Sequence, residues 1–225
     1  MEEVRPEKCV VAVDGPSGSG KSTVSRRLAS AVDGVYLDTG AMYRAVTWAV
    51  LQAGVFLDDA EAIAKVALET ELSIGTSPEA PHFAANGMPV DGPIRGPEVT
   101  AAVSAVAAVP AVRRHLVALQ RAIIAGHPRI VVEGRDIASV VAPSADLKVY
   151  LTASSAARAA RRSAEDATDV ASTEASLARR DQLDSSRAAD PLRQASDAIE
   201  VDTTGMGIDE VVAYLLKLLN SKVSK

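Results

Sequence analysis

The chain has 225 residues, 48% of them hydrophobic and 3% aromatic, and its formal net charge at pH 7 is −5. This length and apolar content suit one α/β domain with an insertion, or two small domains. The negative charge argues against a nucleic-acid-binding protein, and the scarcity of aromatic residues argues against stacking of bases on an aromatic surface.

Cysteine usage and apolar content limit the classes further. Cys9 is the only cysteine, which excludes an intrachain disulfide and a multi-cysteine metal site. Its place in an apolar run predicts a buried structural thiol. Residues 1–8 are polar and lack the apolar region of a signal peptide, and the low-polarity stretch 101–112 is too short to span a bilayer. We therefore expect a soluble cytoplasmic protein.

The first unit along the chain is a strand, a glycine-rich loop and a helix. The apolar run 9–13 predicts a buried strand, and residues 21–32 predict an amphipathic helix. Between them, residues 15–23 fit the phosphate-binding P-loop pattern G-x-x-x-x-G-K-[ST]. A glycine-rich turn that binds nothing is the alternative, and the complete match between a strand and a helix disfavours it.

The backbone of this loop suggests its chemistry. Its glycines permit dihedral angles at which successive N–H groups point at phosphate oxygens, and the helix that follows adds its positive dipole end. Lys21 would contact the β- and γ-phosphates of a nucleotide, and the Ser22 hydroxyl would hold Mg²⁺. The expected ATP-binding residues are Gly15, Pro16, Ser17, Gly18, Ser19, Gly20, Lys21, Ser22 and Thr23.

Strands and helices alternate along most of the chain, which predicts a parallel sheet covered by helices on both faces. The expected strands are 9–13, 35–37, 129–133, 147–151 and 198–201. The expected helices are 21–32, 41–53, 58–70, 98–125 with a break at Pro110, 177–186 and 208–219. A further helix is expected to begin at Ser155, with Ser154 as its cap. Residues 166–173 are small and polar and are expected to form a mobile connection.

One stretch departs from this alternation. Residues 71–97 are rich in proline and glycine, and Asn86-Gly87 lies between two short apolar runs. Asn-Gly in that setting is a hairpin signal. We therefore expect a small β insertion outside the main sheet.

Polar groups follow three of the expected strands. They are Asp14, then Asp38 with Thr39, and then residues 133–136. Ligands of such sheets bind beyond the carboxyl ends of the strands, so these groups could form one site with the P-loop. A turn or a helix cap is the alternative at each position. Glu133 sits where P-loop proteins often place the acid that orients Mg²⁺.

Arginine is concentrated near the C-terminal end of the chain. Residues 154–193 contain seven arginines, seven acidic residues and no lysine. A surface of paired charges is one interpretation, but arginine without lysine favours phosphate contacts for some of them, because guanidinium offers a planar fork. His82, His115 and His127 share no ligand spacing, so no metal or acid–base role is expected of them.

Taken in order, these motifs resemble those of the bacterial cytidylate (CMP) kinases over essentially the whole chain. A P-loop alone would fit many families, whereas the ordered set is specific. The matching segments are residues 10–18, L-D-T-G-A-M-Y-R at 37–44, residues 94–99 with Ser104, Pro110 and Arg113, G-R-D at 134–136, R-D at 180–181 and R-A-A-D-P-L at 187–192.

The resemblance implies a nucleoside-monophosphate kinase fold: an α/β P-loop parallel sheet, a monophosphate-binding insertion and a helical lid in a single P-loop kinase of residues 1–225. The corresponding boundaries are 8–70, 126–153 and 194–225 for the core, about 71–125 for the insertion, and about 154–193 for the lid.

The resemblance also implies roles for individual residues. Arg44 and Arg135 would hold the CMP phosphate, Ser104, Arg113 and Asp136 would read the cytosine edge, and Asp184 with Arg180 and Arg187 would bind the sugar hydroxyls; Thr39 completes the CMP-binding set. The implied catalytic residues are Lys21, Arg135, Arg180 and the two lid arginines, Arg158 and Arg162. Ser22 would bind Mg²⁺, with Glu133 acting through water; Glu133 stands where the family often has Asp.

The expected activity is transfer of the γ-phosphoryl group of MgATP to CMP, with dCMP as a second acceptor. A kinase for another small acceptor such as UMP is one alternative. A switch that hydrolyses a nucleotide slowly is another, and the chain lacks the N-K-x-D-type motif by which such proteins read guanine. A nucleotide-bound module without turnover is a third. The expected partners are these small substrates, with no nucleic acid, no membrane and a monomeric protein.

Overall fold

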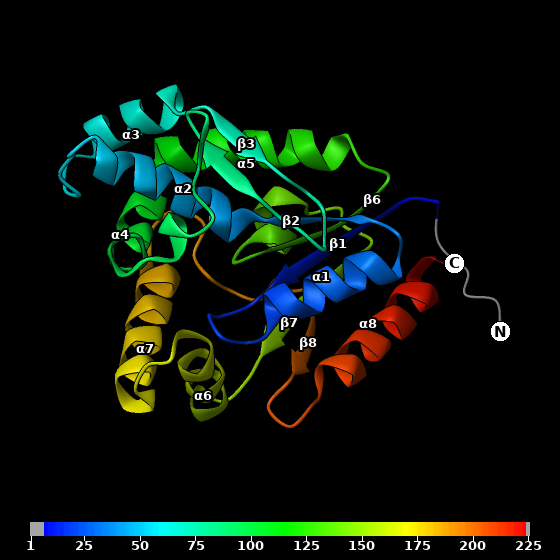
Figure 1. Ribbon diagram of the computed structural model, residues 1–225. Helices are drawn as coiled ribbons and strands as arrows, with labels where there is room; N and C mark the ends of the chain where they lie inside the picture. Colours follow the sequence, from blue (N-terminus) through cyan, green and yellow to red (C-terminus); the bar gives the residue numbers. More distant parts are fainter. Residues whose placement is uncertain (1–6, 224–225) are drawn as a thin grey trace.

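The computed structural model describes residues 7–223 (Figure 1). Of the predicted polar segment 1–8, residues 1–6 lie outside the described part of the chain, as do residues 224–225 of the predicted core. The main sheet has five parallel strands in the order β2-β6-β1-β7-β8, which confirms the predicted parallel sheet. The strands are β1 Cys9–Asp14, β2 Val35–Asp38, β6 Arg129–Gly134, β7 Leu147–Thr152 and β8 Ile199–Asp202.

The central strand β1 separates two hydrophobic cores, because alternate side chains of a strand point to opposite faces of the sheet. Val11 and Val13 pack with α1 (Lys21–Ala31) and α8 (Ile208–Val223). Ala12 belongs to the other core, together with α2 (Thr39–Gln52), α3 (Ala60–Glu69), α4 (Pro97–Ala108) and α5 (Pro110–Ala125). Figure 1 shows α1 and α8 side by side on one side of the sheet, so the prediction of helices on both faces is confirmed.

The stretch expected to be a β insertion forms a separate antiparallel sheet of β3 (Leu72–Ile74), β4 (Phe83–Ala85) and β5 (Met88–Pro89). Asn86 and Gly87 join β4 to β5 with φ angles of 51° and 76°. Left-handed dihedrals at both central residues are the requirement of a tight hairpin turn, which Asn-Gly satisfies at low cost. The predicted hairpin is confirmed. A short 3₁₀ turn, η1 (Pro93–Arg95), leads on to α4.

The expected helical stretch 98–125 is divided where proline predicts. Val109 is extended and α5 begins at Pro110, so that α4 and α5 meet at 95°. Proline cannot donate the backbone bond that would continue α4, and it suits the first turn of α5. Within residues 7–223, no single helix is long and apolar enough to cross a membrane; α4 and α5 meet that criterion only as a pair, across this bend.

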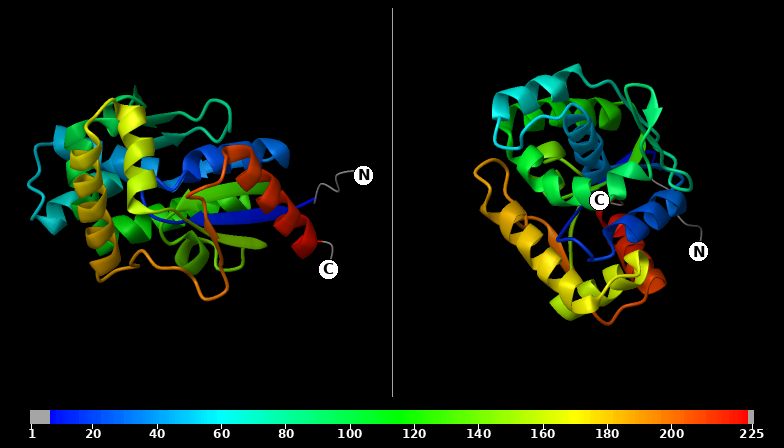
Figure 2. Two further views of the ribbon diagram at one scale, coloured as in Figure 1. Left: turned by 90° about the horizontal axis from the view of Figure 1, so that it is seen from below. Right: turned by 60° about the vertical axis from the view of Figure 1, so that its left-hand side comes forward.

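Two helices occupy the region 154–193, and they lie side by side in both views of Figure 2. Ser154 Oγ accepts a hydrogen bond from the Ala157 N–H at 3.3 Å, which confirms the predicted cap of α6 (Ser155–Asp166). The predicted connection 166–173 is wrong in extent, because α7 (Val170–Ser186) begins well before the predicted helix 177–186. The reason is the Asp169 carboxylate, which caps α7 by accepting from the Ser172 N–H at 2.8 Å.

Cys9 is 1% exposed, which confirms the buried thiol. Burial raises the pKa of this thiol to about 11, so the reactive thiolate is scarce at neutral pH. We expect Cys9 of the native protein to resist a disulfide reagent at pH 8 and to react fully in guanidinium chloride. A spectrophotometric thiol titration measures both, and rapid reaction of the native protein would contradict the burial.

Candidate active site

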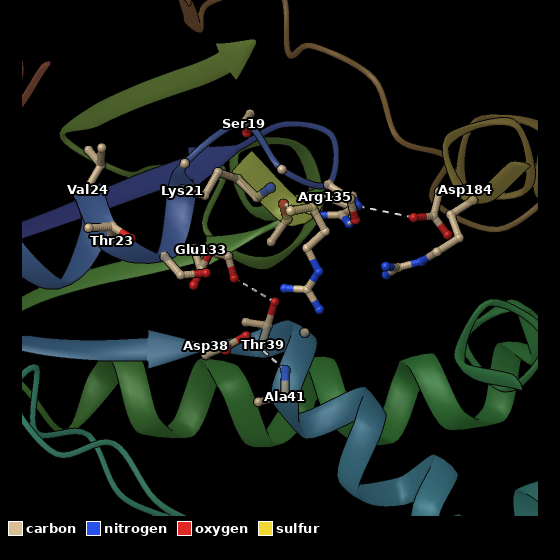
Figure 3. A pocket seen from close by; sticks show the side chains of 18 of the residues that line it. Ser19, Lys21, Thr23, Val24, Asp38, Thr39, Ala41, Glu133, Arg135 and Asp184 are labelled. Carbon is tan, nitrogen blue, oxygen red and sulfur yellow. Dashed lines mark hydrogen bonds and ion pairs between the residues drawn. The ribbon is translucent and has the colours of Figure 1, made fainter. Parts of the chain in front are cut away.

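The main cavity has a volume of about 550 Å³ and lies at the carboxyl ends of β1, β2 and β6 (Figure 3). Most of the residues singled out from the sequence meet there. Those that line it are Ser17 to Thr23 of the P-loop, Thr39, Arg44, Ser104, Arg113, Glu133, Arg135, Asp136, Arg162, Arg180, Asp184 and Arg187. Gly15, Pro16 and Arg158 are not part of this lining, and none of the three histidines belongs to it.

The P-loop turns sharply between β1 and α1 and depends on glycine at two close approaches. A Cβ atom on Gly15 would lie 2.0 Å from the carbonyl oxygen of Leu151, and one on Gly18 would lie 3.0 Å from that of Arg158. Gly18 also has a φ of 76°. The loop therefore fits between β7 and α6 only with glycine at both positions, and it leads directly into the N-terminus of α1.

Lys21, the first residue of α1, is buried beside this loop. Its Nζ donates to the Pro16 carbonyl at 2.7 Å. Burial and the neighbouring Arg135 lower the pKa of Lys21, while Glu133 acts in the opposite direction. The surroundings therefore compensate the charge of the Lys21 ammonium group incompletely, and a bound phosphate group would complete the compensation.

Glu133, the last residue but one of β6, lies opposite Lys21 (Figure 3). The Tyr36 hydroxyl donates to its carboxylate, and the Thr39 hydroxyl donates to its backbone carbonyl at 2.7 Å. Burial and Asp38 raise the pKa of Glu133, while Lys21 and the Ser22 hydroxyl lower it. One carboxylate beside a hydroxyl fits Mg²⁺, which typically uses one or two carboxylates and completes its shell with phosphates and water.

Four arginines concentrate positive charge at the centre of the cavity. Burial, followed in importance by the nearby Arg180 and Arg162, lowers the pKa of Arg44 to about 9. Burial lowers the pKa of Arg180 to about 10, with Arg135 next in importance. Arg44 is held in place by the Ile94 carbonyl at 2.8 Å and the Thr100 hydroxyl at 2.9 Å. Guanidinium groups gathered in this way repel one another unless an anion is bound among them.

Arg135 joins the P-loop to α7. It donates to the Gly15 carbonyl at 3.0 Å, to the Ser17 hydroxyl at 2.7 Å and to the Asp184 carboxylate at 3.1 Å. Asp184 also accepts from the Ser104 hydroxyl at 3.1 Å. The Asp184 carboxylate therefore receives donors from α4 and from the turn after β6.

The predicted base-reading pair is in direct contact. Arg113 donates to the Asp136 carboxylate, and their side chains are 3% and 6% exposed. The guanidinium lies 5.4 Å from the ring centroid of Tyr43, on α2. Desolvation by burial raises the pKa of Asp136, and Arg113 with Arg187 opposes that shift. An acceptor and a donor thus stand next to each other on one wall of the cavity.

The two lid arginines have different surroundings. Arg158 donates to the Ser17 carbonyl at 3.0 Å and to the Asp181 carboxylate at 2.5 Å, so it braces the P-loop from behind. Arg162 lines the cavity and pairs with Glu165 at 3.0 Å.

Two acids that follow strands are helix-capping residues. Asp14 accepts from the Ile137 and Ala138 N–H groups, both at 2.8 Å, and so fixes the start of the short π-helix η2 (Ile137–Val141). Asp38 accepts from the Ala41 N–H at 2.8 Å at the start of α2. The observed contacts of Asp14 and Asp38 are therefore those of helix caps, which was the alternative to a ligand-binding role at these positions.

Several lining residues escaped prediction. Tyr43 lies one helical turn after Thr39, so its position in the matched motif could have indicated it. At the other end of the cavity Arg161 donates to the Thr203 carbonyl at 2.6 Å. The remaining lining there comes from Met206, Gly207, Ile208 and Val211. Nothing in the composition of the segment 203–211 marks it as part of a site.

The family model described as cytidylate kinase matches residues 11–221. A cytidylate kinase of Nocardia farcinica is 53% identical over 220 residues, covering 96% of this chain and 95% of that protein. One of Rhodococcus jostii is 52% identical over 220 residues and covers 96% of each. A gluconokinase structure from Sinorhizobium meliloti aligns with a TM-score of 0.53 at 16% identity, covering 98% and 96% of the two chains, and supports the fold alone.

Asp14 offers a test of the cap that positions Arg135 and Asp136. We expect Asp14→Ala to lower the free energy of unfolding by about 2 kcal/mol at pH 7, because two buried N–H groups lose their acceptor. Urea denaturation measures this loss. The matched control is Asp197→Ala, which removes an exposed carboxylate paired with Lys148 and should have little effect.

The pH dependence of that loss has a defined sign. Burial raises the pKa of Asp14 from 3.8 to about 6, so between these values the folded protein holds a proton that the unfolded chain lacks. Wild-type stability due to Asp14 therefore falls as the pH rises through this window. The gap between wild type and Asp14→Ala should be about 1 kcal/mol larger at pH 5 than at pH 7. A gap that narrows at pH 5 would contradict this.

Proposed function

Because the chain belongs to the cytidylate kinase family, we propose that it transfers the γ-phosphoryl group of ATP to CMP, and also to dCMP. The observation that carries the proposal is the continuity of one cavity. It joins the P-loop at one end to the Arg113–Asp136 pair at the other, and half-buried arginines lie between them. Such a cavity suits two phosphate groups brought end to end.

The donor end would hold ATP. Residues 15–23 present backbone N–H groups and the N-terminus of α1 to its phosphates, and Lys21 would exchange its contact with Pro16 for phosphate oxygens. The cavity wall formed by Thr203, Ile208 and Val211 would receive the adenosine. Ser22, with Glu133 through water, would hold Mg²⁺, which when bound would neutralise charge on the β- and γ-phosphates.

The acceptor end matches the hydrogen-bonding pattern of cytosine. Cytosine presents an exocyclic amine that donates and a ring nitrogen and a carbonyl that accept. The Asp136 carboxylate would accept from the amine, while Arg113 and Ser104 would donate to the two acceptors. Because Arg113 and Asp136 are buried, a base that left them unpaired would be strongly rejected.

The central arginines would receive the acceptor phosphate. Arg44 and Arg135, with Thr39 beside them, would bind the CMP phosphate, and Asp184 with Arg180 and Arg187 would bind the sugar hydroxyls. In the transfer, a CMP phosphate oxygen bonds to the γ-phosphorus as the bond to the β,γ-bridging oxygen breaks, leaving ADP. The attacking oxygen is already anionic, so positioning and charge stabilisation supply most of the catalysis.

The division into moving parts belongs to the same proposal. Residues 71–125 would form the monophosphate-binding insertion and residues 154–193 the lid, both closing on the core to exclude water. Arg158 and Arg162 of the lid would approach the transferring group. The enzyme would act as a monomer, and ATP as donor supports a cytoplasmic location.

The function is tested by ADP release from MgATP with CMP, dCMP, UMP, AMP and shikimate offered separately. We expect rapid release with CMP and dCMP only, and none from Lys21→Ala, which should retain its circular dichroism spectrum. Rapid release with another acceptor would leave a P-loop kinase without this cytosine pocket. Release independent of every acceptor would favour a nucleotide-hydrolysing switch.

The sugar site has its own prediction. Asp184→Ala should raise the KM for CMP roughly tenfold or more, because a buried charged hydrogen bond is worth about 1.5–3 kcal/mol. The KM for ATP should stay within about twofold, since the P-loop provides its contacts. Steady-state kinetics with each substrate varied in turn measures both constants, and equal increases would contradict the placement of the sugar.

A further inference from the structure

Asp190 lies outside every role assigned above, yet its carboxylate contacts Arg113, one of the two proposed base-reading residues. It belongs to the segment 187–193, which follows α7. Its Oδ2 accepts from Arg113 Nε at 2.7 Å. The Arg113 side chain is 3% exposed and that of Asp190 is 35% exposed, so the contact is made at the edge of the cavity wall.

The geometry divides the edges of the Arg113 guanidinium among three partners. Nη2 donates to Asp136, Nε to Asp190, and Nη1 only weakly to the Ala107 carbonyl, at 3.4 Å. The contact at Nε holds the guanidinium group at the end that joins the aliphatic part of the side chain. Such a contact fixes the plane without using the outer N–H groups that a ligand would need.

The backbone of Asp190 is itself held in an unusual conformation. Its φ is 47°, a left-handed value that few residues other than glycine, asparagine and aspartate tolerate. The Arg187 Nε donates to its carbonyl at 2.7 Å. The Leu192 N–H donates to the Asp184 carbonyl at 2.8 Å, which ties the next turn of chain to α7. The carboxylate of Asp190 is thus aimed at Arg113 by a braced segment.

We propose that Asp190 is a positioning residue for base selection: it fixes Arg113 in the orientation that accepts cytosine and disfavours uracil. The inference rests on the proposed function. Uracil presents a carbonyl oxygen where cytosine presents its amine. A guanidinium group that was free to turn could donate to that carbonyl oxygen. When Asp190 holds Arg113 in place, the uracil carbonyl oxygen instead faces the Asp136 carboxylate, and two hydrogen-bond acceptors repel each other.

The same contact connects three parts of the chain. Arg113 comes from α5, Asp136 from the turn between β6 and η2, and Asp190 from the segment after α7. In this proposal, selection of the base therefore depends on the position of the proposed lid, residues 154–193, to which Asp190 belongs.

The test uses Asp190→Gly and Asp190→Asn in the full chain. Glycine removes the carboxylate and tolerates the left-handed backbone, while asparagine keeps the shape and one acceptor oxygen. The matched control is Asp33→Gly. Asp33 has a φ of 51° and an ion pair with Arg129 at 2.8 Å, and it does not line the cavity.

We expect Asp190→Gly to raise the KM for CMP roughly 10- to 100-fold, with kcat and the KM for ATP within about twofold of wild type. The ratio of kcat/KM for CMP to that for UMP should fall roughly tenfold. Asp190→Asn should lie between wild type and Asp190→Gly, and Asp33→Gly should match wild type. Calorimetric titration with CMP alone should give the same order of affinities.

Three results would overturn the inference while the wild type still phosphorylates CMP. One is an unchanged CMP-to-UMP ratio. Another is an equal rise in the KM values for CMP and ATP, which would indicate general loosening. The third is tighter CMP binding, which would mean that Asp190 competes with the base for Arg113. A wild type that neither binds nor phosphorylates CMP would instead overturn the proposed function, and this inference with it.

Discussion

Buried positive charge is the constraint on which the rest of this cavity depends. Lys21, Arg44 and Arg180 all lose solvation, and burial is the first cause of the lowered pKa of each. Such charges are tolerated only where nearby acids or bound anions compensate for them. A site that keeps this excess is a site prepared for phosphate, since its charges gain most when a phosphate arrives.

Three acids in or next to the cavity divide between two tasks. Asp184 and Asp181 hold arginines in place, and each lies on α7. Asp136, buried beside Arg113, offers an acceptor where a neutral base would lie in the proposed enzyme.

The sequence predicted the architecture well wherever the pattern was local. The P-loop, the Asn86-Gly87 hairpin and the break at Pro110 each follow from the dihedral restrictions of a few residues, and each is confirmed. The extent of α7 was missed because its first turn is poor in apolar residues. The cap formed by Asp169 determines where α7 begins. A capping residue is hard to distinguish from a residue of a polar loop in a single sequence.

For the site, the sequence placed most of the lining residues, while contacts between distant segments were beyond it. Nothing in the pattern 187–192 states that the Asp190 carboxylate reaches Arg113, 77 positions earlier. Likewise, the pairing of Tyr36 with Glu133 requires β2 and β6 to be neighbours in register, and that is known only from the folded sheet. The roles of these residues in binding and catalysis remain predictions.

The short segment that ends β6 links the two halves of the cavity. Glu133 faces Lys21 and Ser22, Arg135 reaches the P-loop and α7, and Asp136 meets Arg113. Asp14 fixes the turn that follows them by accepting two N–H groups of η2. In the proposed enzyme, the donor phosphates, the acceptor phosphate and the base would thereby be positioned from four consecutive residues anchored to the central strand. A displacement of this segment would shift all three sites together, so its rigidity matters more to transfer than that of any single contact around it.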